Sequence, residues 1–270
     1  MLRDITIGQY YNTKSPIHSL DVRVKIISLI VMMVVIFMVK SFFEYAVITL
    51  FTIALIFLSR VPFGFILRGM KPVWLLVAFT AVINLFLGGG ETVLFEYGVI
   101  KITKEAVNLA LSMMIRVILL VTMSNLLTLT SSPMIIAKGI EKLLKPLERI
   151  KFPSHEVAMM MSIALRFIPT LTDEAEKIMK AQASRGNDLE SGGIIKKAKG
   201  MIPLFVPLFV SAFRRADELA MAMECRCYNG GKNRTSFNNL TYKKIDAAAY
   251  IIVVLVVCIT FAGRICGAWI

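Results

Sequence analysis

Two short segments, Ala181-Gln-Ala-Ser-Arg185-Gly-Asn187 and Ala222-Met-Glu-Cys-Arg226-Cys-Tyr-Asn229, repeat one pattern. Each has an alanine four residues before an arginine, and a turn sequence follows the arginine. Cations are favoured in the last turn of a helix, and glycine or asparagine commonly ends one. We therefore expect two long helices that both end in an arginine, and we expect the rest of the chain to hold these two ends in place.

The composition around these segments is typical of a membrane protein. Of the 270 residues, 57% are hydrophobic and the mean hydropathy is +0.71, whereas soluble domains are usually about 45–50% apolar. The chain nevertheless carries 31 Lys and Arg against 18 Asp and Glu, a formal charge of +13. That excess must face water or anionic lipid. The polar first 23 residues predict no cleavable signal peptide, so the first span is expected to direct the chain to the membrane.

Apolar runs predict about five membrane-spanning helices, and with them an all-α membrane protein. Most runs are shorter than the ~20 residues that a span needs, so we expect the ammonium groups of Lys25 and Lys40 to reach the interface. Only the fourth run is long enough to cross with tilt. The five predicted spans cover residues 24–39, 45–58, 73–87, 106–129 and 247–262.

The predicted connections differ in character. The stretch Asp21-Val-Arg23-Val-Lys25 precedes the first span and indicates an interfacial anchor. Residues 60–72 form a basic loop with two prolines and two glycines, and residues 91–104 form a short loop that contains a strand-like Val-Leu-Phe segment. The run 201–213 is too short for a sixth span and contains two prolines, so we interpret it as the start of a buried or interfacial helix.

The distribution of basic residues predicts the orientation. With the N-terminus inside, inside segments hold twenty-six of the basic residues and outside segments hold four, with Arg116 within a span. Cytoplasmic loops carry the excess of Lys and Arg, so we expect a cytoplasmic N-terminus and an external C-terminus. The predicted organisation is a leader with four spans over residues 1–132, a cytoplasmic domain over 133–245, and a last span over 246–270.

Three amphipathic helices are predicted in the cytoplasmic domain. The first covers residues 133–148, with Ser132 as its N-cap and Pro133 at its first position. The second begins at Ser154, taken as its N-cap, and Gly186 ends it; Pro169 should kink it. The third covers residues 203–226. A connection rich in glycine and lysine, residues 188–200, joins the two long helices.

The apolar residues of the two long helices recur at helical three-and-four spacing, which predicts one packed face on each. On the second helix the predicted face carries Val157, Met160, Met161, Ala164, Leu165, Ile168, Leu171, Ala175, Ile178 and Met179. On the third it carries Leu208, Ala212, Phe213, Ala216, Leu219, Ala220 and Met223, with Arg214, Arg215, Asp217, Glu218 and Glu224 on the opposite face.

Arg185 and Arg226 admit two interpretations. Either arginine alone fits the favourable interaction between a cation and a helix C-terminus, worth roughly 0.3–1 kcal/mol. Two of them in matched contexts, each preceded by small residues, favour docking to a partner instead. Small side chains allow close approach, and the guanidinium fork suits carboxylates and carbonyls of a groove. The small residues are Ala181, Ala183 and Ser184 in one segment and Ala222 and Cys225 in the other.

Sites for catalysis or metal binding are not indicated. The sequence has no phosphate-binding loop, no HExxH zinc motif, no nucleophile elbow and no paired-aspartate prenyl-phosphate motif. The two histidines, His18 and His155, are far apart in sequence, and the second suits a structural role. The four cysteines do not form a disulfide framework, and Cys225-x-Cys227 by itself only weakly favours a soft metal. An enzyme is therefore not supported.

Two other classes of membrane protein compete with partner docking. An autonomous secondary transporter needs a midplane site built from broken helices or ion ligands, and the spans offer only Arg116, Asn84 and Asn125. With no acidic residue in the spans, Arg116 is expected to lock helices together by hydrogen bonds. A basic scaffold on the membrane surface would explain the charge but not the repeated arginine segments.

At this point the chain resembles a known family, the transmembrane coupling component (T component) of energy-coupling factor transporters. Blocks over most of the chain carry the resemblance: Ser19-Leu-Asp21-Val-Arg23-Val-Lys25, Arg116 through Leu127-Thr-Leu-Thr-Ser-Ser-Pro133, Ala164-Leu-Arg166-Phe-Ile-Pro169, and the two arginine segments. Two residues depart from the family's pattern. Cys227 stands where a small residue, often glycine, is usual, and Val22 stands where proline is usual.

The resemblance implies partners and a role. In that family the two arginine motifs dock into grooves on two ATPase subunits, which bind ATP and Mg²⁺, and a separate S component binds a vitamin or metal for uptake. It implies a multi-pass, non-catalytic subunit of the cell membrane that binds no cofactor and no nucleic acid itself. The implied ATPase-docking residues are Ala181, Ser184, Arg185, Gly186, Ala222, Cys225, Arg226, Cys227 and Tyr228.

Overall fold

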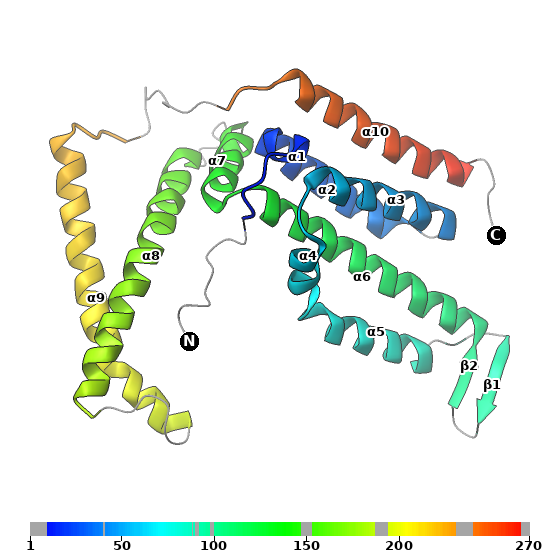
Figure 1. Cartoon of the computed structure of the whole chain (residues 1–270), viewed down its shortest axis with the longest axis horizontal. Helices are drawn as coiled ribbons and strands as arrows, with labels where there is room; N and C mark the ends of the chain where they lie inside the picture. Colours follow the sequence, from blue (N-terminus) through cyan, green and yellow to red (C-terminus); the bar gives the residue numbers. More distant parts are fainter. Residues whose placement is uncertain are drawn as a thin grey trace. The chain divides into compact units, whose positions relative to one another are not determined.

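The chain folds almost entirely into helices, which confirms the predicted all-α class. The computed structural model describes residues 10–39, 41–87, 89, 92–97, 100–146, 153–186, 194–230 and 240–265. These residues divide into two compact units (Figure 1). We call the first, Gly8–Gly139 with Leu240–Ile270, the bundle unit, and the second, the described part of Ile140–Asn239, the long-helix unit.

The bundle unit contains the apolar helices and one β-hairpin. In the hairpin, β1 (Val93–Tyr97) pairs antiparallel with β2 (Ile100–Thr103), where the sequence predicted a loop with a strand-like segment. The helices are α1 (Pro16–Ser19), α2 (Val22–Met38), α3 (Phe42–Ser59), α4 (Phe63–Met70), α5 (Val73–Leu87), α6 (Lys104–Thr130) and α10 (Lys244–Ile265).

A helix occupies each of the five predicted spans. Three of them, α3, α6 and α10, are long and apolar enough to cross a membrane by length and composition. The helices α4 and α5 meet at a bend of 58° and would make a fourth span together. With 17 residues, α2 is about 26 Å long, slightly short of a bilayer core. The number of five spans therefore stays a prediction.

The predicted loop over residues 60–72 was wrong, because α4 forms within it. Ile66 and Met70 lie four residues apart on one face of α4 and are buried against Val61 and Leu129. The guanidinium of Arg68 lies 5.5 Å from the centre of the Phe65 ring. Turn residues at both ends of this segment concealed a short amphipathic helix of about two turns, whose apolar face packs against the rest of the bundle unit.

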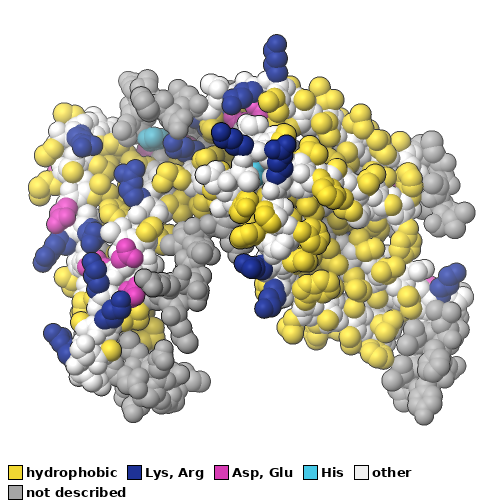
Figure 2. Space-filling view, viewed as in Figure 1, with side chains coloured by type: hydrophobic (Ala, Val, Ile, Leu, Met, Phe, Trp, Pro, Cys, Tyr) yellow, Lys and Arg dark blue, Asp and Glu magenta, His cyan; other side chains and the backbone are white. Residues whose placement is uncertain are grey.

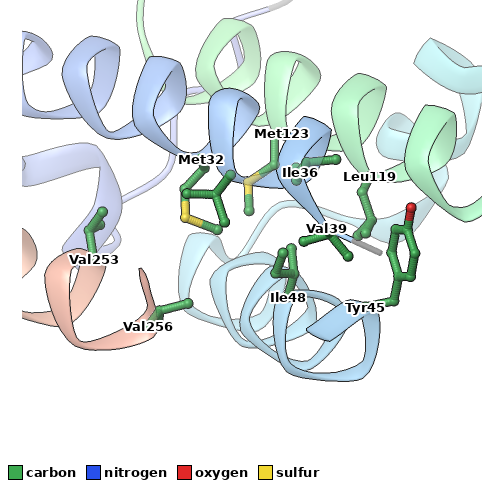
Figure 3. Packing of buried hydrophobic residues seen from close by; sticks show 10 residues of the cluster. Met32, Ile36, Val39, Tyr45, Ile48, Leu119, Met123, Val253 and Val256 are labelled. Carbon is green, nitrogen blue, oxygen red and sulfur yellow. The ribbon is translucent and has the colours of Figure 1, made fainter. Parts of the chain in front are cut away.

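The core of the bundle unit is small and its outer surface is apolar. Met32 and Ile36 of α2, Ile48 of α3 and Leu119 of α6 meet at its centre (Figure 3). Large apolar side chains on the outside are exposed, as at Leu75, which is 82% exposed. Figure 2 shows apolar side chains over most of this face of the bundle unit, while charged side chains gather over the long helices. Such an apolar exterior suits lipid rather than water.

Two cationic side chains join α2 to α6, one near the start of α2 and one just after its end. Lys25 near the start of α2 donates to the Thr130 carbonyl and the Ser131 hydroxyl at the end of α6, both at 3.0 Å. Within α6, Arg116 donates to the carbonyl of Val39 after α2, at 2.8 Å. The interhelical lock expected of Arg116 is thus confirmed. The interfacial position expected of Lys25 stays a prediction; within the bundle unit its ammonium satisfies a carbonyl that the end of α6 leaves without a helical partner.

The start of α10 is hydrogen-bonded to the start of α2. The buried carboxylate of Asp246 accepts from the amides of Asp21 and Lys243 at 2.8 and 2.7 Å. Asp21 caps α2 and forms a 2.9 Å ion pair with Arg23, whose guanidinium also donates to the Leu240 carbonyl. The expected interfacial anchor is therefore a packed junction between segments more than two hundred residues apart in sequence.

The long-helix unit is dominated by α8 (Ser154–Ser184) and α9 (Ile194–Cys225), which follow α7 (Pro133–Leu144). As predicted, α7 begins at Pro133; residues 147 and 148, the end of the predicted first helix, lie outside the described residues. Pro153 rather than Ser154 occupies the N-cap of α8. The predicted start of the third helix at Pro203 was wrong, because α9 already begins at Ile194.

The early start of α9 has a backbone explanation. A proline interrupts a helix by removing one N–H donor and crowding the carbonyl four residues earlier. Pro203 and Pro207 are themselves four residues apart, so both disturb the same side of α9 and the other side keeps its hydrogen bonds. The helix therefore continues through both prolines, and the part of the predicted connection from Ile194 onward is helical.

Candidate docking site

A polar cluster of Glu174, Ser211 and Arg215, which we call the clasp, joins α8 to α9. The carboxylate of Glu174 on α8 accepts a hydrogen bond from the Ser211 hydroxyl at 2.5 Å and one from the Arg215 guanidinium at 3.0 Å. The bond from Ser211, followed by the charge of Arg215, holds the pKa of Glu174 below its ordinary value. Glu174 is therefore an anion at neutral pH, and it joins the two helices near the middle of α9.

An apolar cavity on one side of the clasp shows that the two helices run antiparallel. It has a volume of about 440 Å³. Residues that precede Glu174 on α8 line it together with residues that follow Ser211 on α9. The lining includes Met159, Ile163, Phe167 and Leu171 from α8 and Ala212, Leu219 and Met223 from α9.

The clasp lies midway between the two arginine segments. Eleven residues separate Glu174 from Arg185 along α8, and eleven separate Arg215 from Arg226 along α9. At 1.5 Å per residue each arginine is ~16 Å beyond the clasp along its helix. Because the helices are antiparallel, the two ends point in opposite directions and lie roughly 30 Å apart. Figure 1 shows α8 and α9 crossing within the long-helix unit, and the clasp joins the two helices.

The two arginine-bearing ends share one cap geometry. The amide of Gly186 donates to the Ala183 carbonyl at 3.0 Å, and the amide of Cys227 donates to the Glu224 carbonyl at 2.8 Å. Gly186 and Cys227 both have left-handed backbones, with φ of 79° and 56°. Each arginine is therefore the last residue before a left-handed turn.

The unusual Cys227 does not alter how its helix ends. The amide of Tyr228 donates to the Met223 carbonyl at 3.0 Å, which together with the Cys227 bond completes a Schellman cap. Glycine is the usual residue at this position because a side chain is strained at positive φ. Cysteine adopts the same conformation at some cost in energy, so the direction of Arg226 is kept.

The predicted docking residues are almost all at the surface. Tyr228 alone is half-buried, because its ring lines the cavity between α8 and α9. The hydroxyl of Ser184 donates to the Lys180 carbonyl of its own helix at 3.0 Å. The exposed residues are Ala181, Ser184, Arg185 and Gly186 at one end and Ala222, Cys225, Arg226 and Cys227 at the other.

Metal binding finds no support in the part of the chain that the structure describes. Within it, no three His, Cys, Asp or Glu side chains come close enough to hold a metal ion. Cys225 and Cys227 are exposed thiols. The ring of His155 lies 3.1 Å from the Glu141 carboxylate, between the end of α7 and the start of α8, which fits the structural role expected of it.

Known proteins match this chain over nearly its full length. A family model described as CbiQ, cobalt transport protein, matches residues 13–237. The energy-coupling factor transporter transmembrane protein EcfT of Clostridium kluyveri is 51% identical over 98% of both chains. The proteins of the same name from Ruminiclostridium cellulolyticum and Bacillus subtilis are 50% and 40% identical, over 91% and 98% of this chain and 92% and 100% of their own.

This chain belongs to the EcfT family. It is accordingly a membrane-embedded transmembrane component of an energy-coupling factor transporter, a multi-subunit assembly. The names of its EcfT relatives are those of transporter components, which implies that the chain is not itself a catalyst. The resemblance drawn from the leader, the arginine segments and Pro133 is therefore confirmed.

Sequence reasoning missed the clasp and misplaced parts of the packed faces. Arg215 was assigned to the face of α9 opposite its apolar row, yet it lines the cavity and bonds Glu174. Met160 was assigned to the packed face of α8 and Phe213 to that of α9, yet they are 58% and 68% exposed. No signal in the sequence singles out Glu174 and Arg215, because Asp173 with Arg214 and Lys177 with Glu218 are also oppositely charged pairs equally distant from the motif arginines.

Proposed function

We propose that this EcfT-family chain is the coupling subunit of an ECF-type ABC importer. It links ATP hydrolysis by two ATPase subunits to a separate S component that binds a vitamin or a metal. The observation that carries the proposal is the pair of matched helix ends, at Arg185 and Arg226, on opposite sides of one clasp. Two equivalent ends facing apart suit two equivalent receptors, one on each ATPase subunit.

The chemistry of the ends supports docking rather than a purely structural role. A cation that only balances a helix dipole needs neither small neighbours nor a particular turn after it. Here each arginine has exposed small residues before it and a left-handed residue after it. The guanidinium can therefore enter a groove and donate to carboxylates or carbonyls there. ATP and Mg²⁺ belong to the partners in this proposal.

The motion that we propose follows from the way in which the clasp joins α8 to α9. ATP binding closes the ATPase pair and draws the two helix ends toward each other. Because the helices are joined at Glu174 and Arg215, a shift at the ends turns α8 and α9 about the clasp. This rotation is transmitted to the partner that binds the other surfaces of α8 and α9, which we propose to be the S component.

An exposed apolar row on α9 supports a partner on the long-helix unit. Ile202, Val206, Phe209 and Phe213 are between 58% and 68% exposed, and their spacing puts them on one broad face of the helix. Exposed apolar patches of this size mark interaction surfaces. The description of the CbiQ family mentions cobalt, whereas the names of the EcfT relatives mention no substrate. We therefore propose that the S component determines which substrate is transported.

The excess of basic residues supports a cytoplasmic location for this machinery. In the proposed topology the N-terminus and the coupling domain over residues 133–245 are cytoplasmic, and five spans lie in the cell membrane. An autonomous secondary carrier remains less favoured. Arg116, the ionisable residue expected inside a span, is engaged in fastening α6 to the end of α2.

Reversing the charge at both ends tests the proposal. In Arg185→Glu with Arg226→Glu, the ATPase subunits should no longer co-purify with the chain, and uptake should cease while the chain stays in the membrane. The matched control is Lys177→Glu with Arg214→Glu, which changes the same charge at exposed positions of the same helices away from their ends. Uptake and co-purification that survive in the double end variant would contradict docking.

A further inference from the structure

A second cavity lies inside the bundle unit. It has a volume of about 270 Å³. Its walls come from the first halves of α2 and α10, the second half of α3, the last turns of α6, and α1. It therefore sits at one end of the bundle, where α6 and α3 finish and α2 and α10 begin. We call this the leader end.

The cavity is lined by apolar side chains and opens on the apolar exterior. Apart from Lys25, Ser28 and Thr130, every side chain that lines it is apolar. Leu58 and Ile252 line it while being 52% exposed, so it reaches the outer surface of the bundle. An apolar hollow that faces hydrocarbon is filled by hydrocarbon, because vacuum or water there would forfeit contacts or hydrogen bonds.

Positive charge gathers at the leader end beside this cavity. The stretches 21–25 and 243–246 carry Arg23, Lys25 and two further lysines against two carboxylates, a formal excess of +2. Both carboxylates already have partners. Asp21 forms an ion pair with Arg23 and caps α2, and Asp246 accepts hydrogen bonds from two backbone amides. Lys243 and Lys244, which directly precede the lining residue Ile245, are exposed.

We propose that this cavity binds one anionic phospholipid of the leaflet at the leader end. An acyl chain occupies the hollow, and the phosphate of the headgroup lies against Lys243 and Lys244. The charge of the rim selects an anionic head over a zwitterionic one. In the proposed topology this leaflet is the cytoplasmic one, where anionic lipids also meet the basic leader.

A peptide segment is a poorer occupant than a lipid. A buried peptide backbone needs a partner for each amide and carbonyl, and leaving one unpaired costs free energy. The cavity offers only the side chains of Lys25, Ser28 and Thr130. Two of these already have partners, since the Lys25 ammonium donates to the Thr130 carbonyl and the Thr130 hydroxyl donates to the Leu126 carbonyl. An acyl chain makes no such demand. The lipid would also brace α10 against α2 and α3, with which α10 packs.

Native mass spectrometry of the complete transporter complex, purified in mild detergent, tests the proposal. The wild-type chain should carry a phospholipid adduct, and titration with phosphatidylglycerol should load it more readily than titration with phosphatidylcholine. In Ala249→Phe the new ring fills the cavity and the adduct should be lost. Ala247→Phe is the matched control, because Ala247 is exposed and does not line the cavity.

A second pair of variants tests the headgroup without touching the core. Lys243→Gln and Lys244→Gln should each lower the affinity for phosphatidylglycerol on the order of fivefold, whereas Lys104→Gln, an exposed change at the start of α6, should not. Equal adducts in the two phenylalanine variants, or no adduct on the wild type, would overturn the cavity site. Equal binding of the two lipids would overturn the headgroup contact.

Discussion

The two helix caps predict opposite effects for two single substitutions. A side chain at positive φ costs about 1–2 kcal/mol relative to glycine, and glycine loses about 0.5–1 kcal/mol more chain entropy on folding. The difference favours glycine by about 0.7 kcal/mol at a left-handed cap. Cys227→Gly should therefore stabilise the end of α9 by about 0.7 kcal/mol. Gly186→Ala should destabilise the end of α8 by a similar amount.

Steric contacts do not complicate this estimate. A Cβ atom added at Gly186 would meet no heavy atom within 4 Å, so the substitution tests backbone conformation alone. A free energy of about 0.7 kcal/mol changes the opening equilibrium of a cap about threefold. The reporters are the amides of Cys227 and Tyr228, which donate to carbonyls in the last turn of α9, and the amide of Gly186 at the end of α8.

Hydrogen–deuterium exchange on the complex in lipid nanodiscs measures the effect. Amide exchange at positions 227 and 228 should slow about threefold in Cys227→Gly, and exchange at position 186 should quicken about threefold in Gly186→Ala. Cys225→Ala is the control for loss of a thiol within the helix and should leave both caps unchanged. If both variants change exchange in the same direction, the backbone explanation of these ends is wrong.

Three further substitutions test contacts inside the two units. Arg116→Leu frees the carbonyl that ends α2 and should cost about 1–3 kcal/mol, seen as a lower midpoint of thermal unfolding. Asp246→Ala leaves two backbone amides without their acceptor and should lower the same midpoint, whereas the exposed Asp217→Ala should not. The pKa of Glu174 is lowered from 4.5, so its carboxylate stabilises the helix crossing above that pH, and this contribution disappears as the pH falls through the lowered value. Distances between spin labels on the two helix ends should therefore broaden in acid for the wild type, and Glu174→Gln should show no such pH dependence.

The fold class and the positions of the apolar helices could be predicted because both depend on local composition. Helices occupy each of the five predicted runs, and α7 begins at Pro133 as expected. The connection over residues 60–72 could not be predicted as α4, since its helix gains stability from burying Ile66 and Met70 against distant residues. Turn residues describe what a short segment can do alone, and packing decides whether a helix forms there.

The docking segments were visible in the sequence, but the way they are joined was not. The pattern of Arg185 and Arg226 with small neighbours is local, and so are the turns that follow. The clasp between Glu174 and Arg215 joins residues forty-one apart in sequence, and nothing in either helix alone marks which of its several charges meets the other. Equal spacing to the motif arginines does not indicate the pair either, because Asp173 with Arg214 and Lys177 with Glu218 share it.

By itself the sequence determined a membrane bundle, a charged pair of long helices and two matched arginine ends, because hydropathy, charge and helix-ending residues act over a few turns of chain. The tertiary structure decided which faces pack. Apolar residues surround α8 on more than one side, so periodicity alone could not choose between the row with Met160, which is exposed, and the row with Ile163 and Phe167, which lines the cavity. The tertiary structure also decided which groups Lys25, Arg116 and Asp246 bond to. A buried charge needs partners, and each of these three has a partner in a distant segment.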